Sequence, residues 1–186
     1  MNETLSNIRN RRSTRVFLPT QIKDEELKAI LDAGIYAPSA VNQQPWHFTV
    51  VQNKELLDEL HAKFMEVAKK SENDYVRKVG YNENFHVFYN APTVVLVSGL
   101  EANNNSPVDC AAAVENMLIA SESLDIGACW VGFIAYLLNS EEGKELFEKL
   151  EIPKGFKQIH SVCIGYKKNK SNNGPLRKEN TVNYIK

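Results

Sequence analysis

Three stretches of the chain repeat apolar residues at the spacing of an amphipathic helix. The first begins at Asp24, which is placed as an N-cap, and runs to about Tyr36 before Pro38 stops it. The second covers about residues 54–70 and the third about 107–124. The third is apolar nearly all round, which is typical of a helix that is buried in the core or packed against a partner subunit.

Three further stretches have the pattern of strands. Residues 46–51 alternate apolar and polar side chains, and residues 159–166 also alternate. Residues 93–98 form a continuous β-branched run, the mark of a strand buried on both faces. Residues 71–90 lack clean periodicity and predict a loop or lid with short helical pieces. Helices that alternate with a few strands indicate an α+β or three-layer α/β domain.

Two shorter signals complete the pattern. Gly127 is expected to end the third helix and to be followed by a short apolar turn over residues 130–133. Asn139 and Glu142 resemble a capping box for a helix that reaches Leu150.

Composition then limits the possible functions. A chain of 186 residues suits a single domain, and 22 Lys+Arg against 23 Asp+Glu leave a net charge of -1. This balance gives no general attraction to nucleic acid or to an anionic membrane. Basic residues gather only at 9–15 and 167–178, and residues 167–186 are expected to be disordered or to form an arm that pairs with something.

Targeting and redox signals point to the cytoplasm. We see no signal peptide at the start, and the longest apolar run, residues 128–138, is too short to span a bilayer. Cys110, Cys129 and Cys163 are an odd count without a C-x-x-C pair or a metal-ligand spacing, so we expect reduced and mostly buried thiols and no metal site.

The densest candidate chemistry is the run Arg11-Arg12-Ser13-Thr14-Arg15. Arginine forms forked hydrogen bonds to phosphate, and a serine adds a compact donor. Because three neighbouring like charges repel one another, an anion that neutralises them is a natural explanation. The alternative is a solvated basic turn on the surface.

Two other segments could contact a flat polar ligand. The loop 37–46 is fixed by two prolines, and Ser39, Asn42 and Gln44 offer hydroxyl and amide groups to a heterocycle, although a rigid surface turn would look the same. Small residues at 127–132 would let the backbone approach a ligand. The alternative there is helix termination with core packing of Trp130.

Together these segments resemble the nitroreductase family of FMN flavoproteins. The resemblance rests on Arg-Arg-Ser-Thr-Arg-x-Phe, Ala-Pro-Ser-Ala-x-Asn-x-Gln-Pro-Trp, Gly-x-Cys-Trp-Val-Gly and a Gly-Tyr with a basic tail, in this order over essentially the whole chain. It implies an α+β three-layer sandwich, with a mixed central sheet flanked by helices, in an intertwined homodimer that binds FMN at the subunit interface. NADH or NADPH would be the co-substrate.

The resemblance also assigns roles to individual residues. Arg11, Arg12 and Ser13 would hold the FMN phosphate and ribityl chain, and Arg15 would lie near the pyrimidine end of the ring and tune it. Residues from the other subunit would reach the same flavin: Pro38, Ser39, Ala40, Asn42 and Gln44. Trp130, Val131 and Gly132 would back the ring, and Arg177 would close over the phosphate. Since Lys167 follows Gly165-Tyr166 where the family often has proline, Lys168, Arg177 and Lys178 all remain candidates for the phosphate.

The implied activity is hydride transfer from NAD(P)H through FMN to a nitroaromatic, a quinone or a related small molecule by a ping-pong mechanism. No side chain need act as a nucleophile, because the cofactor carries the chemistry. An FMN-binding relative with a reductive dehalogenase, flavin-storage or sensor role would carry the same motifs. An anion- or nucleic-acid-binding module built on the arginines is disfavoured by the near-neutral net charge.

Overall fold

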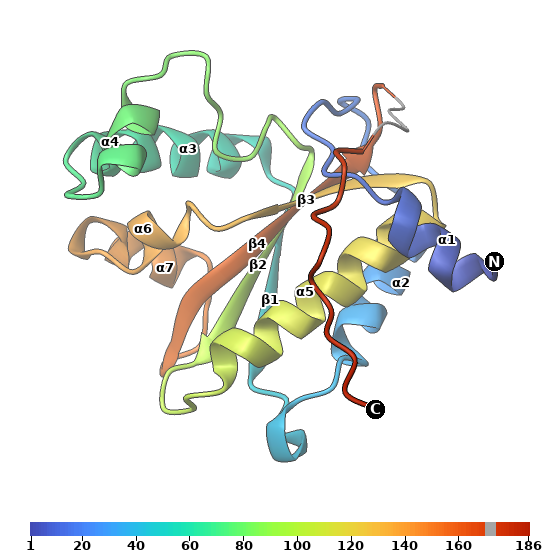
Figure 1. The fold of residues 1–186 in the computed structure, drawn as a ribbon. Coiled ribbons are helices and arrows are strands. Elements are labelled where there is room, and N and C mark those ends of the chain that lie inside the picture. Colours follow the sequence, from blue (N-terminus) through green and yellow to red (C-terminus); the bar gives the residue numbers. More distant parts are fainter. Residues whose placement is uncertain (170–173) are drawn as a thin grey trace.

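A sheet forms the middle layer of the computed structural model, which describes residues 1–169 and 174–186 (Figure 1). Its four strands within these residues pair antiparallel in the order β1-β2-β4-β3. The strands are β1 (Trp46–Val51), β2 (Thr93–Leu100), β3 (Ile126–Val131) and β4 (Phe156–Tyr166).

Helices cover both faces of the sheet, which confirms the three-layer α+β architecture (Figure 1). On one side lie α1 (Glu3–Asn10), α2 (Asp24–Ile35) and α5 (Ser106–Ser123). On the other lie α3 (Lys54–Lys69), α4 (Asp74–Gly80), α6 (Ala135–Leu138) and α7 (Lys144–Lys149). Two 3₁₀ turns, η1 (Ala40–Asn42) and η2 (Glu141–Gly143), interrupt the connections. None of the helices in the described residues is long and apolar enough to cross a membrane.

The central strand β2 divides the core into two halves. Val94 and Leu96 pack into the cluster that contains Phe64 of α3, whereas Val95 and Val97 pack into the cluster that contains Met117 of α5. All four valine and leucine side chains are fully buried. The continuous apolar run in the sequence therefore marks a strand covered on both faces, as predicted.

Helix α5 packs against both the sheet and α2. The two helices approach closely at Gly34, where an added Cβ would collide with Met117. Not all of α5 is covered, because Val108 remains 71% exposed. Of the two alternatives expected for this apolar helix, burial in the core is confirmed for one face, and packing against a partner subunit stays a prediction.

The predicted helix end at Gly127 is wrong, because α5 ends at Ser123 and Gly127 lies in strand β3; the predicted turn over residues 130–133 is wrong for residues 130 and 131, which also belong to β3. Asp125 makes the turn with a φ of 56°, and the strand then continues through Gly127 and Trp130 to Val131. Apolar side chains occur on both faces of β3, with Cys129 and Val131 in one core cluster and Ile126 and Ala128 in the other. Without polar alternation, six residues give no periodicity signal that separates a strand from a turn.

Two predicted helix starts are also wrong. Asp24 is the first helical residue of α2, and the cap position is taken by Lys23, whose backbone N–H donates to the Glu26 carboxylate at 2.9 Å. Asn139 is not an N-cap: it lies at the C-cap of α6, and its side-chain amide bonds to the backbone N and O of Gln158 at 3.1 and 2.8 Å. Helix α7 begins only at Lys144.

The resemblance predicted a mixed sheet, but within the described residues parallel pairing is found at one isolated bridge only. The four strands are antiparallel, and the parallel component is an isolated bridge between Ser13 and Ala128 of β3. The cysteines are buried, as predicted, at positions 110, 129 and 163.

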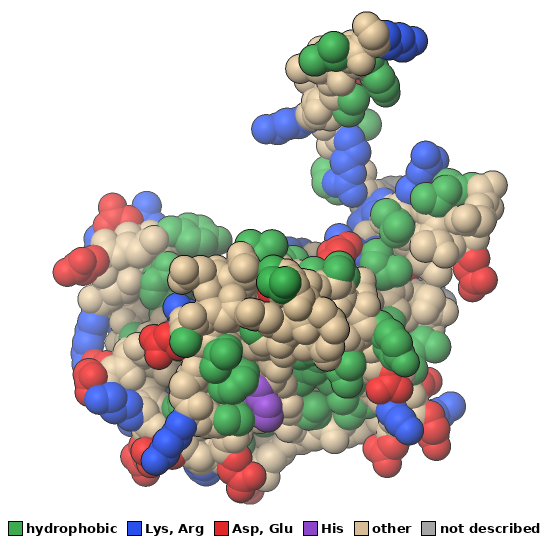
Figure 2. Space-filling view, turned by 90° about the horizontal axis from the view of Figure 1, so that it is seen from below, with side chains coloured by type: hydrophobic (Ala, Val, Ile, Leu, Met, Phe, Trp, Pro, Cys, Tyr) green, Lys and Arg blue, Asp and Glu red, His purple; other side chains and the backbone are tan. Residues whose placement is uncertain are grey.

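The C-terminal tail (residues 174–186) stands away from the body. In the view from below, a column of atoms with hydrophobic and basic side chains projects from the molecule (Figure 2). Leu176 and Ile185 are 99% and 98% exposed. Whether the tail is disordered or an arm that pairs with something therefore stays a prediction.

Candidate functional site

Residues 11–17, hereafter the arginine segment, run in extended conformation along the edge strand β3. The Thr14 N–H donates to the Ala128 carbonyl at 2.9 Å, and Phe17 forms an antiparallel bridge with Lys167 just after β4. The Leu18 N–H donates to the Tyr166 carbonyl, also at 2.9 Å. The segment is therefore fixed at both ends by the sheet, and its side chains project from a rigid support.

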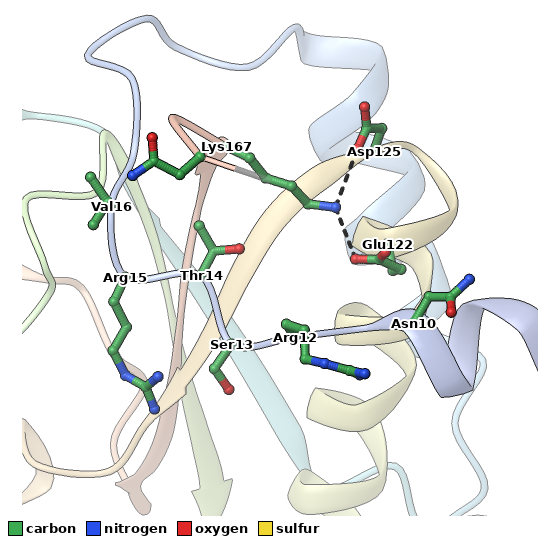
Figure 3. A pocket seen from close by; sticks show the side chains of 10 residues that line it. Asn10, Arg12, Ser13, Thr14, Arg15, Val16, Glu122, Asp125 and Lys167 are labelled. Carbon is green, nitrogen blue, oxygen red and sulfur yellow. Dashed lines mark hydrogen bonds and ion pairs between the residues drawn. The ribbon is translucent and has the colours of Figure 1, made fainter. Parts of the chain in front are cut away.

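Alternate side chains of the arginine segment converge on one place. Arg11, Ser13 and Arg15 all act on the Cys129 thiol of β3, where they oppose the effect of burial that raises its pKa. Ser13 and Arg15 point to the same side, away from the Lys167 ammonium (Figure 3). Because burial prevails, the thiol stays protonated at neutral pH and supplies no negative charge to the two arginines.

These two cations also lack carboxylate partners. In residues 1–169 and 174–186, no Asp or Glu lies within ion-pair distance of Arg11 or Arg15. Both Ser13 and Arg15 are exposed. Two uncompensated guanidiniums beside a hydroxyl make an anion-binding arrangement that is open to a ligand.

Arg12 is used differently from its neighbours. Its Nη1 donates to the carbonyl oxygens of Arg9 and Arg11, both at 2.7 Å, and so satisfies the C-terminal end of α1. The guanidinium also touches the tail, because a Cβ at Gly174 would collide with it. Its buried Nε has no hydrogen-bond partner among the described residues. The structure does not group Arg12 with the other two arginines.

A cavity of about 410 Å³ lies beside the arginine segment (Figure 3). Arg12 and Arg15 contribute to its lining, but its third cation is already neutralised, because the Lys167 ammonium lies 2.9 Å from Glu122 and 3.3 Å from Asp125. An anion would meet two carboxylates there. The Cys129 side of the segment is the better anion site.

Arg15 has a partner that the sequence pattern did not reveal. Its Cζ lies 5.7 Å from the ring centroid of Tyr89, and the hydrogen bond between the two side chains is the main cause that raises the pKa of Arg15. Tyr89 lies between α4 and β2 with a φ of 54°. In the sequence, a tyrosine before Asn-Ala-Pro indicates a turn. No sequence pattern indicates that this tyrosine contacts Arg15, which lies 74 positions earlier.

The predicted ring-backing residues lie on the same sheet edge as the arginine segment. Trp130 is 38% exposed, and its ring meets that of His160 edge-on at 4.8 Å. Val131 is buried, and its carbonyl accepts a hydrogen bond from Ser161 at 2.8 Å. An added Cβ at Gly132 would enter open space. The structure thus brings the first and third sequence motifs together.

The proline-flanked loop is rigid, but it lies elsewhere. The Ser39 hydroxyl accepts from the Gln44 N–H at 2.9 Å, Asn42 accepts from the Gln44 amide at 3.0 Å, and the Ala40 N–H donates to buried Asp109 at 3.1 Å. With Pro38 at its start, this loop lies at the opposite end of the molecule from the arginine segment (Figure 1). One chain alone does not bring the two together.

The three basic candidates at the C-terminal end are divided between the body and the tail. The Lys168 N–H donates to the Val16 carbonyl at 3.2 Å, which places Lys168 next to the arginine segment. Arg177 and Lys178 lie on the exposed tail.

Comparisons with known proteins agree on one relationship. Residues 8–166 match the model of the nitroreductase family. A protein of Archaeoglobus fulgidus is 34% identical over 173 residues, which are 90% of this chain and 87% of that protein. Its name gives its assignment as a provisional NADH dehydrogenase/NAD(P)H nitroreductase. The FMN reductase [NAD(P)H] of Bacillus subtilis is 26% identical over 196 residues, covering 99% of this chain and 74% of the reductase.

Solved structures show the same relationship. A nitroreductase with bound FMN from Bacteroides fragilis superposes with a TM-score of 0.93 at 34% identity, over 100% of both chains. A second nitroreductase with bound FMN, from Desulfitobacterium hafniense, has a TM-score of 0.91 at 29% identity, again over 100% of both chains.

Proposed function

Since the chain belongs to the nitroreductase family, we propose that it takes hydride from NAD(P)H and passes the electrons to a nitroaromatic, a quinone or a related acceptor by ping-pong turnover. The enzyme class is FMN-dependent NAD(P)H oxidoreductase, and its cofactor is FMN. The observation that carries the proposal is the pair of uncompensated arginines, Arg11 and Arg15, beside Ser13 on the sheet edge.

The residues present fit this cofactor. FMN offers a phosphate with nearly two negative charges at neutral pH, and its ring gains negative charge on reduction. Arg11 and Ser13 supply charge-assisted and hydroxyl hydrogen bonds for the phosphate end. Arg15 supplies a fixed positive charge for the ring. Bound FMN itself supplies the hydride chemistry, because it can accept two electrons from a nicotinamide and return them to an acceptor.

The remaining site residues keep the roles that the resemblance implied. Trp130 and Gly132 offer a flat surface and an open approach at the edge of β3. Arg12 is the weakest candidate for the phosphate, because two carbonyl groups already occupy its Nη1. Lys168 gains support from its position beside Val16, and Arg177 and Lys178 remain candidates from the tail.

We further propose that the working unit is a homodimer with a site built from two chains. The loop that carries Ser39 and Asn42 cannot reach the arginine segment of its own chain (Figure 1). Exposed apolar side chains on several elements offer surface for such an association: Leu5, Ile8, Tyr36, Val41 and Val108. The second copy would bring its loop to the flavin.

An anaerobic titration tests the proposed activity. The purified protein should be yellow or take up FMN, and NADH or NADPH should bleach the flavin absorbance without an acceptor present. Steady-state oxidation of NAD(P)H with a panel of nitroaromatics and quinones then separates an enzyme from a flavin-storage protein. A protein that cannot be loaded with FMN would refute the proposal.

Subunit complementation tests the shared site. Arg11→Ala and Asn42→Ala are expected to impair FMN binding in their respective homodimers. A heterodimer of the two variants contains one fully native site if each site takes its arginines from one chain and its loop from the other. We expect such heterodimers, isolated through two different tags, to bind one FMN. No recovery of FMN binding would mean that the site is not shared in this way.

A further inference from the structure

Tyr89 is a neutral partner for a cation whose charge the site needs. Its ring lies 5.7 Å from the Arg15 Cζ, and its side chain is the main cause that raises the pKa of this guanidinium. A carboxylate in this place would orient Arg15 but would also cancel its charge. A phenol orients the guanidinium and leaves the positive charge available to a ligand.

The backbone of Tyr89 is held in an unfavourable conformation. Tyr89 and Asn90 both have a φ of 54°, a region that residues other than glycine rarely adopt. Such strain persists only where the surroundings impose it, and it is concentrated at functional sites.

A histidine provides this restraint. The Nδ1 of His86 accepts the N–H groups of Phe88 at 3.1 Å and Asn90 at 3.3 Å, and the His86 carbonyl accepts the Tyr89 N–H at 3.0 Å. The His86 ring stacks on His61 of α3 with centroids 4.1 Å apart. The turn 86–90 is therefore fastened to α3, and Tyr89 is fixed independently of Arg15.

We propose that Tyr89 is a positioning residue, which holds the Arg15 guanidinium in the orientation that favours reduced FMN over oxidised FMN. This inference rests on the proposed function and extends it to a residue outside the family motifs quoted above. A long, exposed arginine would otherwise move among several rotamers, and a cation stabilises charge best when it is already in place. Tyr89 removes that freedom before the ligand arrives.

The test compares Tyr89→Phe, Arg15→Ala and the double variant, all loaded with FMN. Two quantities are measured: the dissociation constant of oxidised FMN and the midpoint potential of the bound flavin. We expect Tyr89→Phe to weaken the preference for reduced FMN about tenfold, which lowers the potential by about 30 mV for a two-electron couple. The dissociation constant of oxidised FMN should change less than threefold. Arg15→Ala should lower the potential further.

The double variant separates positioning from simple packing. If Tyr89 acts through Arg15, the double variant has the potential of Arg15→Ala, because residue 89 has no guanidinium left to orient. Tyr81→Phe is a matched control, since Tyr81 faces the Lys69 ammonium at 5.9 Å in a similar tyrosine–cation pair. Its potential should equal that of the wild type. Tyr89→Leu serves as a second variant if Tyr89→Phe fails to fold, with the same direction expected.

Three results would overturn the inference while leaving the proposed function intact. They are a Tyr89→Phe potential equal to that of Tyr81→Phe, an effect of Tyr89→Phe that adds to that of Arg15→Ala, and an equal weakening of the binding of both redox forms. A wild-type protein that binds no FMN would instead refute the proposed function, and the inference with it. The wild-type titration therefore distinguishes the two failures.

Discussion

His86 should make the folded protein sensitive to mild acid. Burial and the neighbouring charge of His61 lower its pKa from 6.5 to about 4, with a smaller contribution from Lys54 against the opposing effect of Asp58. Its Nδ1 is also committed as an acceptor for two backbone N–H groups. Protonation would turn that acceptor into a donor and break both bonds.

The direction and size of the effect follow from linkage. Between pH 6.5 and about 4 the unfolded chain binds a proton at position 86 and the folded chain does not. This contribution to stability is thus fully present above pH 6.5, is lost as the pH falls, and levels off below about 4. The full pKa difference corresponds to ~3.4 kcal/mol at 1.36 kcal/mol per pH unit. Since the ring is only half-buried, screening reduces our expectation to ~1–2 kcal/mol.

Urea unfolding at several pH values between 7.5 and 4 measures this term. His86→Asn is the informative variant, because the Asn Oδ1 can still accept backbone N–H groups but does not titrate in this range. The wild type should lose ~1–2 kcal/mol more than the variant over the interval, with equal m-values in both. Burial also lowers the pKa of His61, and the variant removes the titrating neighbour of this ring. The difference in stability between wild type and variant therefore measures the combined effect of His86 and His61. Parallel stability curves would refute the reasoning.

Two further pairs of substitutions test the frame around the site. Lys167→Met should cost ~2–3 kcal/mol in urea unfolding, because it removes the cation beside the largely buried Glu122 carboxylate, whereas the exposed Lys149→Met should cost under ~1 kcal/mol; equal losses would contradict this. Gly127→Ala should cost ~1–3 kcal/mol, because its Cβ would lie 2.7–2.9 Å from Thr14 atoms and push the arginine segment off β3. Gly132→Ala, which meets open space, should stay within ~0.5 kcal/mol, and an equal loss in both glycine variants would exclude the clash with Thr14 as the cause.

The sequence was sufficient for elements whose pattern is locally complete. Local sequence alone predicts four such elements, because each repeats its apolar pattern over enough residues: helices α2, α3 and α5 and the β-branched strand β2. Strand β3 escaped prediction because both of its faces are apolar and its residues small, so that Gly127 resembled a helix stop. Asn139 resembled a cap because its true partner, Gln158, is distant in sequence.

The candidate site was likewise predicted only where its residues are close together in the sequence. Arginines close together in sequence predict an anion, but the sequence does not say which side chains point the same way. The extended backbone puts Arg11 with Arg15 and turns Arg12 to the carbonyls of α1. The role of Tyr89 could not be predicted for another reason: its contact with Arg15 forms only when the chain folds.

The pairing of the arginine segment with the end of β4 has a consequence for synthesis. Phe17 forms its bridge with Lys167, 150 positions later in the chain. At 5–20 residues per second, a ribosome needs roughly 8 to 30 s to make the residues between them. The part of the proposed cofactor site that leaves the ribosome first therefore stays without its β4 pairing until almost the whole protein has emerged. Nascent chains stalled before residue 167 should hold no flavin, however well their helices have formed.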